Sequence, residues 1–189
     1  MATKHGTIKK TSLASYSNPR NGGIIAISLD QNDSLIDAKL TDGNQEIILA
    51  TRDGSAVRFN ENNVRPTGRS SQGVRGIRLS KDDYAVGMVV AKNNETLLTV
   101  TENGYGKRTE VSEYRLISRG GSGVINILCS ERNGKVASIA SVANDDEIML
   151  ITMKGITIRT SVSQISVIGR NTQGVRLIKL EQDDKLVGI

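Results

Sequence analysis

The chain has 189 residues, 25 Lys and Arg against 20 Asp and Glu, and a net charge of +5. That length is enough for one well-buried core and does not require two domains. With one His and one Cys the chain lacks a set of soft metal ligands and cannot form an internal disulfide, so we expect no metal centre and no cofactor.

No stretch approaches the roughly 20 apolar residues that a membrane-spanning helix needs. The N-terminus has no apolar core of the kind found in signal peptides. We therefore expect a soluble cytoplasmic protein without a membrane partner. Aromatic residues make up only 3% of the chain, so its core must be built from Ile, Leu and Val, which favours β-strands.

One pattern recurs four times along the chain. A turn glycine stands at Gly6, Gly54, Gly104 and Gly155, and a second glycine, here called the closing glycine, stands at Gly23, Gly73, Gly123 and Gly174. The spacing stays between 48 and 51 residues, which indicates a repeat architecture whose units bury apolar faces against their neighbours. We place the repeats at about 1–46, 47–95, 96–146 and 147–189, within a single domain 1–189.

Each repeat is predicted to contain four short strands. Apolar runs that end at Thr3, Thr51, Thr101 and Thr152 precede the turn glycines. The strands expected after the turn are Thr7–Thr11, Ala56–Phe59, Tyr105–Thr109 and Ile156–Thr160. Those expected after the closing glycine are Ile24–Leu29, Val74–Leu79, Val124–Cys129 and Val175–Leu180. The strands expected last in each repeat are Leu35–Leu40, Tyr84–Val90, Val136–Val142 and Leu186–Ile189. Four strands in about 50 residues is the size of a propeller blade, so the expected fold is all-β.

Charge alternates in step with the repeats. The segments 3–27, 51–79, 101–129 and 151–180 together carry +14, and the segments between and after them carry −9. A ring of such repeats would place cations on one surface, as expected of a polyanion-binding protein. Double-stranded DNA held by its phosphates fits, because base stacking would need more aromatic residues than this chain has.

The candidate DNA-binding residues are the cations that recur near the turn and closing glycines. They are Lys9, Lys10, Arg20, Arg58, Arg65, Arg69, Lys107, Arg108, Arg115, Arg119, Arg159 and Arg170. Each of them alone is more simply a solvated surface residue, and only their recurrence in register favours DNA. Arg75, Arg78 and Arg176 point to alternate faces of their strands and could serve packing or solubility instead.

Catalytic motifs are absent from the glycine-rich segments. No Walker A spacing and no Gly-x-Ser-x-Gly occurs, and His5 is the only imidazole. The Asp pairs, such as Asp82 with Asp83, are typical of β-turns and match no calcium-binding loop.

The segments Thr101–Gly123 and Thr152–Arg176 closely resemble the C-terminal domain of the DNA gyrase A subunit. That family carries a box Gln-Arg-Arg-Gly-Gly-Lys-Gly in its first blade. The nearest match here is a degenerate box-like segment, which keeps one Arg and three Gly: Ser118, Arg119, Gly120, Gly121, Ser122 and Gly123.

The resemblance implies a propeller-like β-pinwheel, here with four four-stranded blades, whose basic rim wraps duplex DNA non-specifically and supports negative supercoiling. It further implies that the chain has no turnover of its own and associates with the nucleoid. Its implied partners are the rest of the gyrase A polypeptide and the gyrase B subunit, which is the ATPase. Family members commonly have about six blades, so four repeats put full wrapping in question.

Three alternatives remain open from the sequence. The corresponding C-terminal domain of topoisomerase IV has fewer blades and also a degenerate box. A propeller could instead be a protein-interaction scaffold, or an enzyme, which the shortage of His and Cys disfavours. The short first strand leaves a sheet edge that the final strand, Lys185–Ile189, or another chain would have to cover.

Overall fold

The computed structural model describes all residues 1–189 as strands, turns and four short 3₁₀-helices. The prediction of an all-β fold built from four-stranded blades is confirmed for three blades, and the fourth has three strands. None of the helical turns has the length and apolar character needed to cross a bilayer.

Each sheet is one blade. Blade 1 has the strand order β3 (Leu35–Asp37), β1 (Ala2–Thr3), β2 (Thr7–Ile8) and β6 (Val74–Arg75). Blade 2 has the order β7 (Ala85–Ala91), β4 (Glu46–Thr51), β5 (Ser55–Asn60) and β10 (Val124–Ile125). Blade 3 has the order β11 (Val136–Val142), β8 (Thr96–Thr101), β9 (Tyr105–Glu110) and β14 (Val175–Arg176). Blade 4 has the order β15 (Leu186–Gly188), β12 (Glu147–Thr152) and β13 (Thr157–Ser161).

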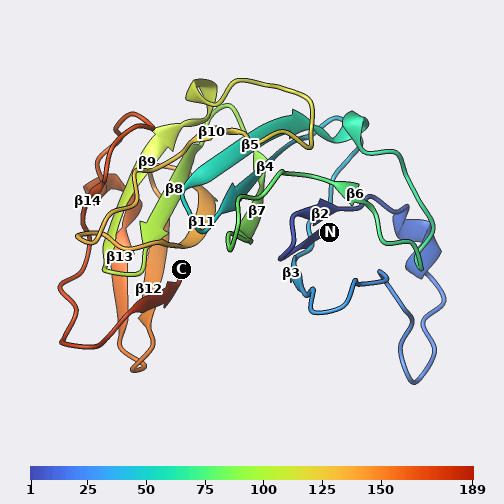
Figure 1. Cartoon of the computed structure of the whole chain (residues 1–189), viewed down its shortest axis with the longest axis horizontal. Helices are drawn as coiled ribbons and strands as arrows, with labels where there is room; N and C mark the ends of the chain where they lie inside the picture. Colours follow the sequence, from blue (N-terminus) through green and yellow to red (C-terminus); the bar gives the residue numbers. More distant parts are fainter.

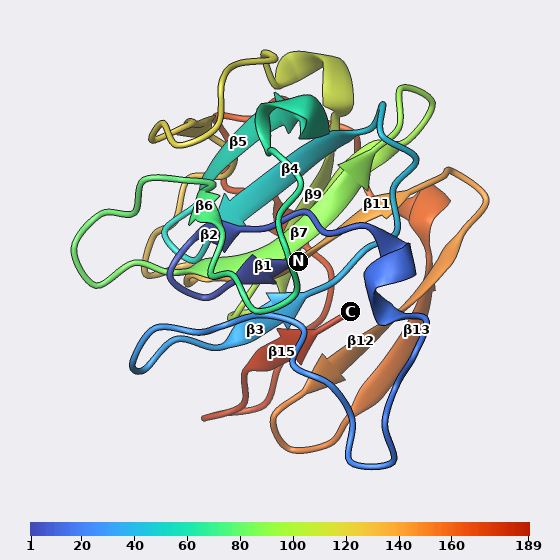
Figure 2. The ribbon, with the colours of Figure 1, turned by 90° about the vertical axis from the view of Figure 1, so that its right-hand side faces the viewer.

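The blades form an open arc (Figure 1). β7 packs against β11, β3 packs against β7, and β15 packs against β11, so these strands line the inside of the arc. Blade 1 lies at one end of the arc and blade 4 at the other. Figure 2 views the molecule from the end that carries β1, β2 and β3. The last strand, β15, pairs with β12 of its own blade and does not cover the edge of the first blade.

The outermost strand of blades 1, 2 and 3 comes from the following repeat. Val124 pairs with Ala56, Val74 with Ile8, and Val175 with Gly106. The closing glycine before each of these strands must be a glycine, because a Cβ on Gly123 would lie 2.1 Å from the carbonyl oxygen of Ala56. Its φ of +75° is also a conformation that L side chains rarely adopt.

The strands expected after the closing glycines are wrong in length. Only two residues of each pair as a strand, and residues 24–29 form no strand. The reason is visible in blade 2, where the backbone N–H groups of Asn126 and Ile127 both donate to the carbonyl of Gly54, at 2.8 and 3.2 Å. The segment therefore bends around the turn of the neighbouring blade and leaves the ladder.

Apolar clusters fill the spaces between blades rather than the blades themselves. Along β4, Ile47 and Leu49 belong to the cluster against blade 1, while Ile48 and Ala50 belong to the cluster against blade 3. A strand buried on both faces requires a continuous apolar run, as the sequence of β4 has. In β12 burial alternates instead, and Met149, on the face away from blade 3, is 56% exposed.

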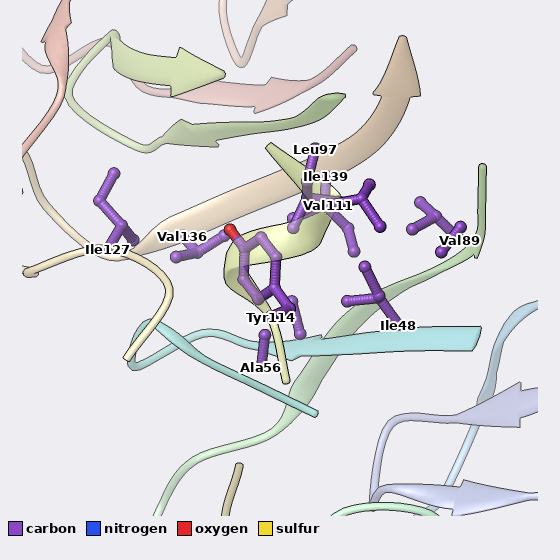
Figure 3. Close-up of a cluster of buried hydrophobic side chains, with 11 residues drawn as sticks. Ile48, Ala56, Val89, Leu97, Val111, Tyr114, Ile127, Val136 and Ile139 are labelled. Carbon is purple, nitrogen blue, oxygen red and sulfur yellow. The ribbon is translucent and has the colours of Figure 1, made fainter. Parts of the chain in front are cut away.

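Tyr114 is the largest fully buried side chain, and it follows the 3₁₀-helix η3 (Val111–Glu113). Figure 3 shows its ring within the cluster between blades 2 and 3. The Tyr114 hydroxyl donates to Asn126 Oδ1 at 2.6 Å, and Asn126 Nδ2 donates to Thr99 Oγ1 at 3.0 Å. All three polar groups are buried, so the network holds together three separate segments of the third repeat. Burial raises the pKa of the Tyr114 hydroxyl, which stays protonated and keeps donating.

A buried lysine links blades 3 and 4. Lys107 is fully buried, and its ammonium donates to the carbonyls of Gly169 and Arg170, at 2.6 and 2.7 Å. Burial lowers the pKa of Lys107 to about 8, because the interior disfavours the charged form.

We expect Tyr114→Phe to lower the free energy of unfolding by about 1–2 kcal/mol, because it removes a buried donor and leaves the oxygen of Asn126 without it. The control is Tyr16→Phe, the counterpart in the first repeat, whose hydroxyl makes a longer bond of 3.3 Å to Ala26 in a half-buried setting. Chemical denaturation of both variants checks this. Equal losses would contradict a special role for the buried network.

Lys107 should make stability depend on pH. Between pH 8 and the unfolded value of 10.5 the folded state has lost the proton while the unfolded chain still binds it, so stability rises with pH in this window. Relative to Lys107→Met, the wild type should gain on the order of 2 kcal/mol from pH 7.5 to pH 10. Denaturation curves at these two pH values measure the gain, and Lys179→Met, at an exposed position, is the control. The prediction is refuted if the free energy of unfolding changes by the same amount between the two pH values in the wild type and in Lys107→Met.

Candidate nucleic-acid interface

The twelve candidate cations fall into two groups in the structure. Six lie on or directly after the strands that follow the turn glycines, and we call them the strand cations: Lys9, Lys10, Arg58, Lys107, Arg108 and Arg159. Six lie in the segments before the closing glycines, and we call them the loop cations: Arg20, Arg65, Arg69, Arg115, Arg119 and Arg170.

Five of the six strand cations hold neighbouring blades together. Lys9 is buried and donates to the carbonyls of Ala26 and Arg69, and the latter bond matches the one from Lys107 to the carbonyl of Arg170. Burial lowers the pKa of Lys9 as well. Arg108 is 5% exposed and donates to the carbonyl of Ile165 in the next repeat, at 2.9 Å. These ammonium and guanidinium groups are hydrogen-bonded inside the fold and are not available to a phosphate.

Lys10 and Arg58 are nearly as enclosed. Lys10 donates to the carbonyl of Glu61 at 3.0 Å, with the Glu61 carboxylate 3.6 Å away. Hydrogen bonds and the neighbouring cation keep the pKa of Glu61 below its usual value despite burial. Arg58 donates to the carbonyls of Val111 and Tyr114, at 2.8 and 3.1 Å, and pairs with Glu46.

Arg159 is the exception that explains the pattern. In the structure Arg159 contacts no neighbouring 3₁₀-helix, and its side chain is 72% exposed and pairs with Glu147 of its own blade. The recurrence of the strand cations thus comes from the repeated junction between blades. Their position within strands, rather than in loops, is the sequence signal that distinguishes them.

The loop cations remain at the surface, and three of them are held in place. Arg69, Arg119 and Arg170 each donate through one terminal nitrogen to the carbonyl two residues after the preceding closing glycine, at 3.0, 3.0 and 2.8 Å. A guanidinium has five N–H donors, so each keeps others for a ligand. Arg20 makes no such bond.

Arg65 and Arg115 occupy equivalent exposed positions just after the 3₁₀-helices η2 (Glu61–Asn63) and η3. Neither makes a side-chain hydrogen bond or an ion pair within the chain. Both are therefore free to bind an anion.

Five more cations lie on the outer side of the arc with the loop cations, although the sequence pattern did not single them out: Arg75, Arg78, Lys81, Arg176 and Lys179. All five are exposed. The segments 11–29, 62–81, 114–130 and 165–180 carry one, five, two and three cations and no Asp or Glu. Their strands β6, β10 and β14 are the outermost of their blades. These segments are therefore positive, which is the electrostatic property that attracts a polyanion, and Glu113 is an exposed acid beside them, since its carboxylate accepts from the N–H of Arg170 at 3.2 Å.

The box-like segment Ser118–Gly123 crosses from blade 3 onto blade 2. The N–H of Gly120 donates to the carbonyl of Gly76 at 2.6 Å, and the carbonyl of Gly121 accepts from Arg78 at 2.9 Å. Arg119 also donates through Nε to the carbonyl of Asn63, at 2.8 Å. Of the three glycines in this segment, Gly123 is the one that permits a close backbone approach, and Ser118 and Ser122 remain exposed.

No three His, Cys, Asp or Glu side chains are grouped as a metal site would require. The single imidazole, His5, lies at the surface 3.9 Å from a carboxylate oxygen of Asp33. The chemistry that this surface can perform is the binding of phosphates along a curved path.

The chain matches the sequence model described as "DNA gyrase C-terminal domain, beta-propeller" in four segments, at residues 1–42, 45–92, 95–143 and 146–189. It is 61% identical over its whole length to the DNA gyrase A subunit of Buchnera aphidicola subsp. Acyrthosiphon pisum, and 49% identical to that of Salmonella typhimurium strain LT2. It spans 23% and 22% of the length of these two relatives.

Two solved structures share the fold. A DNA gyrase A C-terminal domain superimposes with a TM-score of 0.89 at 32% identity, over 98% of this chain and 62% of that one. The C-terminal domain of a DNA topoisomerase IV superimposes with a TM-score of 0.93 at 27% identity, over 99% of this chain and 59% of that one. The match to the sequence model covers nearly every residue, and so the chain belongs to the DNA gyrase C-terminal domain family of β-propellers.

Proposed function

We propose that this chain binds duplex DNA non-specifically along the outer perimeter of its arc, as the DNA-wrapping part of the A subunit of a gyrase. The observation that carries the proposal is the set of segments that contain cations and no Asp or Glu, where exposed arginines of successive blades follow one another. Phosphate contacts of this kind supply affinity without sequence information.

The tyrosines support backbone rather than base recognition. Tyr114 is buried, and Tyr84 and Tyr105 lie beneath basic side chains, with Lys4 Nζ 4.5 Å from the Tyr84 ring. No row of exposed aromatic rings is left on which single-stranded bases could stack.

A curved perimeter also favours wrapping. Bending 20–30 bp of duplex costs on the order of 1–6 kcal/mol, so several blades must hold the DNA at once. The arginines fastened to backbone carbonyls, Arg69, Arg119 and Arg170, lose little rotamer entropy on binding, because part of that entropy is already lost in the free protein.

The proposal also covers the domain organisation of the chain, its partners and its location in the cell. The chain is one domain, with repeats at about 1–46, 47–95, 96–146 and 147–189, that has no turnover of its own. In the cytoplasm, on nucleoid DNA, it acts with the rest of the gyrase A polypeptide and with the gyrase B subunit, which is the ATPase. The identity to several gyrase A polypeptides favours this assignment over topoisomerase IV.

Neutralising three perimeter cations should weaken DNA binding and its salt dependence. For Arg65→Gln/Arg75→Gln/Arg115→Gln we expect a loss of affinity of about tenfold or more and a salt slope smaller by about 2–3, one unit per lost phosphate contact. Fluorescence anisotropy with a labelled duplex at several salt concentrations measures both.

The control changes the net charge by the same amount elsewhere. Lys39, Lys92 and Lys135 each pair with an acid, namely Asp37, Glu95 and Asp53. Their triple Gln variant should keep the wild-type slope. If the two variants lost affinity equally, only net charge would matter and the perimeter would not be the binding surface.

Wrapping is tested by ligating nicked plasmid in the presence of increasing protein and resolving the topoisomers after protein removal. We expect a progressive change of linking number with one sign, and none with the perimeter variant at the same occupancy. Salt-sensitive binding without any change would refute wrapping by this chain while leaving DNA binding intact.

A further inference from the structure

The segments that supply the outermost strands of blades 1, 2 and 3 expose two equivalent positions, the second and the fifth residue after the closing glycine. The fourth residue is buried in every case, so each segment turns one side outward and the other into the fold. The exposed pair is Arg75 and Arg78 in blade 1, and Arg176 and Lys179 in blade 3. At these two blades the outward side of the segment is therefore basic.

Blade 2 differs at both positions. Its outward pair is Ile125 and Leu128, which are 47% and 39% exposed, while Asn126 and Ile127 between them are buried. Figure 1 shows β10 on the outer side of the arc, between β6 and β14. An apolar pair therefore interrupts the row of cations in the middle of the outer surface.

The backbone that presents this pair is fixed. Ile125 pairs with Ser55 in the ladder, and its carbonyl accepts from Arg170 Nη1 at 2.8 Å. The N–H of Leu128 donates to the carbonyl of Thr172 at 2.9 Å. Because the segment is already ordered, little entropy is lost when it contacts a ligand.

Cations stand on both sides of the apolar pair. Arg170 is fastened to Ile125 itself, and Arg119 donates to the carbonyl of Arg75 at 3.0 Å, at the equivalent position of blade 1. A duplex held by the cations of blades 1 and 3 has to cross Ile125 and Leu128 on its way. Neither side chain can bind a phosphate, so what they offer the duplex at blade 2 is a contact inside a groove.

The chemistry of the two grooves distinguishes which one faces the pair. A narrowed minor groove has an enhanced negative potential and attracts basic side chains, which blade 2 lacks at these positions. The major groove carries the C5-methyl group of thymine, the one apolar group on the edges of the base pairs. Three residues of chain span at most about 10 Å, less than the roughly 12 Å width of the major groove, so both side chains fit into it together.

We propose that Ile125 and Leu128 enter the major groove of the bound duplex and contact thymine methyl groups, which gives the non-specific surface a bias in favour of methyl-bearing bases. The inference rests on the proposed function, because the cations of blades 1 and 3 bring the duplex to this point. The phosphates supply most of the affinity, and the apolar pair adds a part that does not depend on salt.

The test changes only the methyl groups of the DNA. Fluorescence anisotropy at several salt concentrations compares a labelled duplex that contains thymine with the same duplex containing uracil, which lacks the C5-methyl group. A second pair compares cytosine with 5-methylcytosine in a G·C duplex. We expect the wild type to bind the methylated member of each pair about two- to fourfold more tightly, the gain from burying one methyl group. The salt slope should be equal for both members.

Two variants and a control assign the bias to the apolar pair. Ile125→Ser/Leu128→Ser should keep the wild-type salt slope and lose the methyl preference. Ile125→Arg/Leu128→Lys restores the cations of the neighbouring blades, so it should lose the preference as well and bind with a salt slope larger by about 2. The control is Leu40→Ser/Val187→Ser, since these exposed residues lie after β3 and on β15, away from the outer strands. It should retain the preference.

The outcomes separate this inference from the proposed function. Salt-sensitive binding by the wild type without a methyl preference overturns the inference alone, and is the result expected if the apolar pair contacts a protein instead of DNA. A preference that survives in Ile125→Ser/Leu128→Ser overturns it too, because the methyl groups are then recognised elsewhere. A wild type that binds no duplex overturns both.

Discussion

Every blade but the last depends on a strand that it does not encode. β6, β10 and β14 come from the repeat that follows the blade they complete, and the apolar clusters lie between blades. A single repeat can neither finish its sheet nor bury its apolar faces, so stability arises at junctions. The glycines, the buried lysines and the fastened arginines all serve this one constraint, which explains why they recur with a single period.

That constraint also limits what could be predicted from the sequence. Strands within a hairpin were predictable, because an Asn-Gly or Asp-Gly turn between apolar runs is a local signal, and Tyr105–Thr109 lies within β9 (Tyr105–Glu110). The segments after the closing glycines were not, because their course depends on the carbonyl of a turn glycine some 70 residues away in the chain. Local alternation of apolar residues contains no information about that partner.

The same dependence on a distant partner explains why the predicted DNA-binding cations fall into a buried group and a surface group. A recurring cation predicts a repeated partner, and the sequence alone does not say whether that partner is a phosphate or a backbone carbonyl. For Lys107 and Arg108 it is the carbonyl of the next repeat. For Arg119 the structure shows both possibilities in one residue, since part of its guanidinium binds the carbonyls of Asn63 and Arg75 while the side chain stays at the surface. The same arginine can thus stabilise a junction and present charge outward.

The exchange of strands has a consequence for synthesis on the ribosome. The residue pairs that complete blades 1, 2 and 3 are Ile8 with Val74, Ala56 with Val124, and Gly106 with Val175. Blade 2 therefore stays incomplete, with an open edge, until the ribosome has added almost seventy further residues. At 5–20 residues per second this delay is on the order of several seconds, far longer than a hairpin needs to form. The nascent chain always carries one unfinished edge at its growing end, and the order of translation sets the order in which the blades are completed.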